Sequence, residues 1–177
     1  MRYTKSMFEE WAANRRRIVP ILNGSEARFL RINKQVGIKI YSTKESRDFA
    51  VQKQRQFSKY GLGPAVYGQF MVSAETLQRI PKWNSETFTA QSQYYTYITQ
   101  AANMTKPWPE EIAEFERKLE ETFPNDEFCT GDFRDGNFGR IKRKLVLIDF
   151  GMLTLEGTDG GTISCDVHDS SWYWYSN

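Results

Sequence analysis

The chain has 177 residues, of which 40% are hydrophobic and 15% aromatic, which suits one domain with a packed core and excludes an intrinsically disordered protein. The formal net charge is only +2, but residues 1–60 hold 14 basic and 5 acidic side chains, which leaves 10 and 17 for residues 61–177. This asymmetry fits a solvated basic face, a region that meets polyphosphate, or nucleic-acid binding through the first part of the chain.

Capping signals and alternation predict the elements of the first 60 residues. Ser6 and Glu9 have the spacing of a capping box and should begin a short helix that ends near Arg16. The same signal recurs at Ser42 and predicts a helix over residues 43–60. Three strands are expected between these helices, at residues 18–22, 27–32 and 35–41.

The strand over residues 35–41 has two different faces. Its apolar residues alternate with glycine, lysine and tyrosine, which is the period of a half-buried strand. Lys39 should therefore lie on the face opposite to Val36 and Ile38.

The remainder of the chain again predicts both helices and strands. Residues 82–92 form a polar stretch that we interpret as a loop. The expected elements are strands at residues 65–72 and 93–99, a helix from Pro107 to Pro124, and a hairpin of two strands at 137–141 and 145–148. This order of helices and strands predicts an α+β fold.

The cysteines and the hydropathy of the chain predict a cytoplasmic protein. Cys129 and Cys165 are far apart, and neither has a second cysteine or a histidine at metal-ligand spacing, so we expect reduced thiols. No stretch approaches the roughly 20 apolar residues of a membrane span, and residues 1–10 contain no apolar signal region. We therefore expect no membrane partner.

Four polar residues match the needs of phosphoryl transfer from ATP. That reaction needs a lysine near the phosphates, oxygen ligands for magnesium, and a carboxylate that orients the attacking hydroxyl. Asp132 stands five residues before Asn137, and Asp149 begins an Asp-Phe-Gly sequence at the end of the last expected strand. Together with Lys39, these residues supply the required groups in chain order.

At these positions the chain resembles the protein-kinase-like superfamily. Residues 132–137 are similar to its catalytic loop, residues 146–151 to the strand that enters the Asp-Phe-Gly motif, and residues 36–39 to the strand that carries the lysine. Two further segments, 23–27 and 61–64, resemble the atypical kinases, which include the RIO type and the aminoglycoside, choline and lipopolysaccharide sugar kinases.

The resemblance covers residues 18–151 and implies a two-lobed, protein-kinase-like α+β fold in a single domain over residues 1–177. Residues 1–100 would form a strand-rich N-lobe with a short N-terminal helix. Residues 101–177 would form a reduced C-lobe.

The resemblance also implies roles for individual residues. Asp132 would be the catalytic carboxylate, and Lys39 would contact the α- and β-phosphates of ATP. Asn137 and Asp149 would hold magnesium. The remaining nucleotide-binding positions are Gly24 and Ser25 over the phosphates, Gln52 as the partner of Lys39, and Gln100 and Ala102 in the hinge that meets adenine.

Three departures from the family pattern bear on activity. Gln52 stands where a glutamate usually pairs with the lysine, and Glu45 and Asp48 are alternative partners. Thr130 stands where the catalytic loop usually has histidine. Few residues follow Gly151, so the helices that bind a protein substrate are not expected.

The leading hypothesis is a minimal, atypical kinase that depends on ATP and magnesium and acts on a small molecule, a partner protein or itself. A first alternative is a pseudokinase that binds nucleotide or a partner protein without turnover, and a related one is transfer of AMP in place of phosphate. A nucleic-acid-binding protein that uses the basic first half is less favoured but stays open.

Overall fold

The structure is a computed structural model that describes residues 3–14, 21–23, 27–81, 83, 91–124, 133 and 136–149. The helices are α1 (Lys5–Ala13), α2 (Lys44–Lys59), α3 (Ala74–Gln78) and α4 (Pro109–Thr122). The strands are β1 (Ile21–Asn23), β2 (Ala27–Arg31), β3 (Val36–Tyr41), β4 (Val66–Ser73), β5 (Gln93–Gln100), β6 (Asn103–Met104), β7 (Phe138–Ile141) and β8 (Lys144–Leu147). Helices thus combine with antiparallel sheets, which confirms the predicted α+β class.

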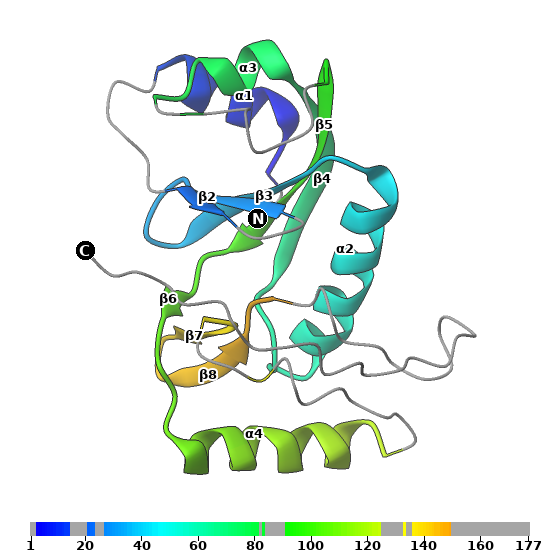
Figure 1. The fold of residues 1–177 in the computed structure, drawn as a ribbon, viewed down its shortest axis with the longest axis vertical. Helices are drawn as coiled ribbons and strands as arrows, with labels where there is room; N and C mark the ends of the chain where they lie inside the picture. The colour runs from blue at the N-terminus through cyan, green and yellow to red at the C-terminus, as the bar shows by residue number, and fades with distance from the viewer. Residues whose placement is uncertain are drawn as a thin grey trace, which may run out of the picture.

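The larger sheet has five antiparallel strands in the order β1-β2-β3-β5-β4. Helix α2 covers one face of this sheet, and α1 and α3 lie together on the other side (Figure 1). The central strand β3 places Lys39 opposite Phe29 of β2 and Tyr97 of β5. The lysine therefore sits in the middle of the sheet.

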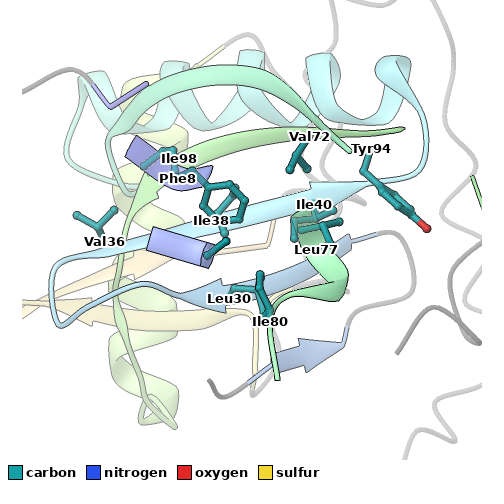
Figure 2. Close-up of a cluster of buried hydrophobic side chains, with 11 residues drawn as sticks. Phe8, Leu30, Val36, Ile38, Ile40, Val72, Leu77, Ile80, Tyr94 and Ile98 are labelled. Atoms are coloured by element: carbon teal, nitrogen blue, oxygen red, sulfur yellow. The ribbon is translucent and has the colours of Figure 1, made fainter. Parts of the chain in front are cut away.

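The two faces of β3 differ as the sequence predicts. Val36, Ile38 and Ile40 are buried in a core with side chains from α1 and α3, and Figure 2 shows this cluster. Tyr41, on the opposite face, packs with residues of α2. Because side chains alternate along a strand, Lys39 lies on the α2 face with Tyr41, which confirms the expected orientation.

The smaller sheet has three antiparallel strands in the order β6-β7-β8. Phe57 and Leu62, at and just beyond the end of α2, share a buried cluster with α4 and with Phe138 and Leu147 of the small sheet. A single helix thus contributes to the cores beside both sheets. The order of these elements from top to bottom can be followed in Figure 1.

The first turn of α4 is tied to the small sheet by Glu111. Its carboxylate accepts the Trp108 N–H (3.0 Å) and two hydrogen bonds from the Arg140 guanidinium (2.6 and 2.8 Å). The hydrogen bond from Arg140 is the main cause that lowers the pKa of Glu111. A carboxylate is also favourable in this turn because the positive end of a helix stabilises negative charge.

Some sequence predictions differ from the structure in detail. The N-caps are Thr4 and Thr43, whose hydroxyls accept the N–H groups of Met7 and Ser46. The first cap lies two residues before the expected Ser6, and the second lies one residue after the expected Ser42. The short helix α3 and the two-residue strand β6 were not predicted, because elements of that length show no periodicity. Parts of the segments expected at 18–22 and 82–92 lie outside the described residues.

No helix in the described part of the chain is both long and apolar enough to span a membrane.

Candidate functional site

Ile148 joins three of the predicted site residues. The Lys39 Nζ donates a hydrogen bond to the Ile148 carbonyl at 2.6 Å, across 109 positions of sequence. The Ile148 N–H in turn donates to the Asn137 carbonyl at 2.7 Å. Asp149 is the next residue in the chain and is exposed. The large sheet thus brings its lysine to the place where the small sheet presents Asn137 and Asp149.

The environment of Lys39 suits a lysine that meets an anion. Burial lowers the pKa of its ammonium group, and the nearby Asp149 carboxylate opposes this effect. A cation in such a place has lost part of its hydration, so an incoming negative charge would stabilise it. Together with the neighbouring carboxylate, this arrangement suits a polyphosphate that arrives with a metal ion.

Helix α2, which is described along its whole length, buries no carboxylate against the sheet. Glu45 is exposed, and Asp48 forms an ion pair with Arg47 at 2.7 Å. The expected partner of the lysine, Gln52, is also exposed and is not among the residues that α2 buries. The buried residues of this helix are Arg47, Ala50, Val51, Lys53, Gln54 and Phe57.

The amide that faces the sheet is Gln54, which the sequence analysis did not single out. Its Nε2 donates to the Pro64 carbonyl (2.9 Å) and to the Thr99 hydroxyl (2.5 Å), and its Oε1 accepts the Tyr97 hydroxyl (2.8 Å). A signal for this residue was present in the sequence. Gln54 follows Ala50 by four positions, the spacing that places two residues on one face of a helix.

Tyr97 links this amide to the strand that carries the lysine. It is fully buried beside Lys39 on the neighbouring strand and stacks on Tyr41 with ring centroids 5.9 Å apart. Burial is the main cause that raises the pKa of Tyr97 well above its ordinary value. The hydroxyl therefore stays neutral and acts as a hydrogen-bond donor to Gln54.

The two predicted hinge residues lie in the segment that joins the two sheets. Gln100 ends β5, and its N–H donates to the Ala65 carbonyl at 2.8 Å. Ala102 is buried, and its carbonyl accepts a hydrogen bond from the Arg31 guanidinium of β2. This segment runs beside the position where Lys39 meets Ile148.

Two glycines allow close packing on either side of that segment. A Cβ on Gly37 would lie 2.2 Å from the ring of Phe29, so the edge of the ring packs against the glycine. A Cβ on Gly139 would lie 2.7 Å from the Ala102 Cβ and 3.2 Å from the Ile148 side chain. Neither glycine has room for a side chain, because real Cβ atoms essentially never come so close.

The residues that the structure places can be separated from those that it does not. Lys39, Asn137 and Asp149 come together, Gln100 and Ala102 lie in the joining segment, and Gln52 lies apart on the surface. Gly24, Ser25 and Asp132 lie outside the described residues.

A hollow of about 480 Å³ lies over α2 and β4 rather than at Lys39. It is lined by Asp48, Val51, Gln52, Arg55, Gln56 and Gln69. Lys39, Asn137 and Asp149 contribute nothing to this lining, so the hollow is not the site at Ile148.

The described residues also bear on metal binding. Among them there is no group of three or more histidine, cysteine or acidic residues that could hold a metal ion. Magnesium needs no such group, because it is often held by one or two protein oxygens together with water and substrate phosphates. Asn137 and Asp149 fit that smaller requirement.

Comparison with models of known protein families finds no match, and a search of curated proteins finds no match either.

Proposed function

We propose that the chain is an ATP- and magnesium-dependent phosphotransferase of a minimal, protein-kinase-like kind. The observation that carries this proposal is the meeting of Lys39, Asn137 and Asp149 at Ile148. In this proposal the large sheet with α1, α2 and α3 is the N-lobe. The small sheet with α4 belongs to a reduced C-lobe.

Each group in the site has a defined task in this reaction. The ammonium group of Lys39 would bind phosphate oxygens in place of the Ile148 carbonyl that it now contacts. Asn137 and Asp149 would hold magnesium, which when bound neutralises charge on the phosphates. Asp132 would orient the acceptor hydroxyl, as the resemblance implies. Such catalysis depends on position and charge and needs few side chains.

A second candidate function is nucleotide binding without transfer. One observation favours it: α2, which covers the lysine face of the sheet, buries Gln54 there and no carboxylate. The ammonium group of Lys39 is then positioned by the Ile148 carbonyl and the field of Asp149 rather than by an ion pair with the helix. A lysine held in this way would bind phosphate but could be less well aligned for transfer.

Nucleic-acid binding through the basic first half gains no support from the described residues. Three basic side chains of that half, Arg28, Arg47 and Lys53, are at most 8% exposed. Part of the positive charge is therefore used inside the fold and is not available to a phosphate backbone.

Replacement of Asp132 tests the phosphotransferase directly. We expect Asp132→Ala to reduce transfer of the γ-phosphate by about 100-fold or more, since a positioned general base contributes about that much. Magnesium–ATP binding should be retained, because Asp132 has no predicted contact with the nucleotide. Mass spectrometry of the acceptor separates added phosphate from added AMP.

The matched control is Glu120→Ala, which removes an exposed carboxylate from α4 and should leave the transfer rate unchanged. Equal rates in Asp132→Ala and the natural chain would contradict the assigned role. Binding of ATP with no transfer by the natural chain would favour the second candidate function.

A further inference from the structure

Arg31 of β2 reaches across to the segment that joins the sheets. Its guanidinium donates to the Ala102 carbonyl and to the Asn103 Oδ1, the latter at 3.2 Å. Arg31 lies opposite Gly37 in the sheet and, by alternation along β2, on the same face as Phe29. One charged side chain therefore occupies a backbone acceptor beside the candidate nucleotide site.

The neighbouring backbone donor, the Ala102 N–H, differs from the Ala102 carbonyl in its hydrogen bonding. Ala102 is only 8% exposed, and no described residue accepts a hydrogen bond from its N–H. The N–H of Ala101, in contrast, donates to the Gln35 carbonyl at 2.8 Å. A buried N–H without a partner is unfavourable, so a ligand that offers an acceptor there would be stabilised.

An aromatic ring lies on the same face of the large sheet as Arg31. Phe29 is half-buried and presents the edge of its ring to Gly37, whose strand neighbour on the other side is Thr99, three residues before Ala102. Aromatic side chains bind nucleobases by stacking, and such stacking tolerates different bases because each has a π-face.

We propose that Arg31 determines which nucleotide bases this site accepts. The inference rests on the proposed function. The base would stack on Phe29 and accept one hydrogen bond from the Ala102 N–H, while Arg31 keeps the Ala102 carbonyl from any amino group of the base. The ligand class is purine nucleoside triphosphates with an acceptor on the ring edge, and the 6-amino group of adenine is not needed.

The chemistry of the adenine edge explains why Arg31 matters. That edge carries an acceptor next to an amino donor, and the N–H and carbonyl of one residue can bind such a pair, as paired residues of antiparallel strands do. A charge-assisted hydrogen bond from a guanidinium is stronger than a neutral one from an amino group. The amino group of adenine would therefore not displace Arg31 from the Ala102 carbonyl.

The test compares ATP with purine riboside triphosphate, which lacks only the 6-amino group. Calorimetric titration with magnesium should give dissociation constants within about two-fold of each other for the natural chain. In Arg31→Met the freed carbonyl should favour ATP by about five-fold, the size of one neutral hydrogen bond. The loss of charge affects both nucleotides alike and cancels in the ratio.

Arg117→Met is the matched control, since it removes an arginine from the exposed face of α4 and should leave the ratio unchanged. If the natural chain binds ATP five-fold more tightly than purine riboside triphosphate, the inference is overturned and the proposed function still stands. An unchanged ratio in Arg31→Met would overturn the role of Arg31. Failure of both nucleotides to bind the natural chain would overturn the proposed function itself. If Arg31→Met does not fold, the comparison of ATP with purine riboside triphosphate on the natural chain still tests the inference.

Discussion

Lys39→Met should reduce phosphoryl transfer by about 100-fold to 1,000-fold, the usual effect of removing one charge-stabilising group from an active site. Methionine keeps most of the apolar stem of the lysine, so the fold should survive. The variant loses the ammonium group that now donates to Ile148 and that would bind the phosphates. Initial rates of γ-phosphate transfer and the dissociation constant of magnesium–ATP measure the effect.

The control for this variant is Lys44→Met, which removes an exposed lysine at the start of α2. It should match the natural chain in both rate and binding. A Lys39→Met protein with the activity of the natural chain would show that the lysine does not serve the reaction. If the natural chain shows no transfer and Lys39→Met binds ATP more weakly than the natural chain does, the result would fit a nucleotide-binding protein without turnover.

Phe57→Ala should cost about 3–5 kcal/mol of unfolding free energy, the usual range for a buried phenylalanine. Phe57 is fully buried and lies in the cluster that joins α2 to Leu62, Phe115 and Phe138. Its removal leaves a cavity where α2 shares a core with α4 and the small sheet. Urea denaturation of the nucleotide-free protein measures the loss.

Gln52→Ala is the matched control on the same helix, because Gln52 is exposed and its replacement should change stability by no more than about 0.5 kcal/mol. A loss below about 1 kcal/mol in Phe57→Ala would mean that this part of α2 is not packed as described. Such a result would also weaken the site, since Phe138 of the same cluster follows Asn137 directly.

The sequence was most informative where the signal is local. The alternation of β3 predicted that Lys39 and Ile38 lie on opposite faces, and the buried cluster with α1 and α3 confirms it. The limits of α2 were predicted to within one residue, because a cap and a helix-ending glycine mark both ends. Gly61 has a φ of +74°, the left-handed conformation that such a position favours.

Contacts between distant parts of the chain could not be predicted in the same way. No local pattern reveals that Arg31 bonds to Ala102, since that contact depends on how the two sheets meet. Gln52 was named from the family spacing alone, and Gln54, whose helical spacing from Ala50 indicates the covered face, was not considered in the sequence analysis. Burial, which decides the matter, is a property of the folded helix.

The position of Lys39 has a consequence for ligand binding. Its hydrogen bond to the Ile148 carbonyl at 2.6 Å must be exchanged for bonds to phosphate when a nucleotide binds. Because Ile148 precedes Asp149, the same event would free the backbone beside the proposed magnesium ligand. Binding of nucleotide and of metal should therefore be coupled, and each should be weak without the other.

The most direct test of this coupled site is thermal unfolding with magnesium, with and without ATP, on the natural chain and on Asp149→Ala. At ATP about 100 times its dissociation constant, ligand binding stabilises the native state by about 2.7 kcal/mol, which for a chain of this size raises Tm by about 5–10 °C. We predict this rise for the natural chain only when magnesium is present, and its loss in Asp149→Ala. No rise in the natural chain, or an equal rise in both proteins, would contradict a nucleotide site built from Lys39, Asn137 and Asp149.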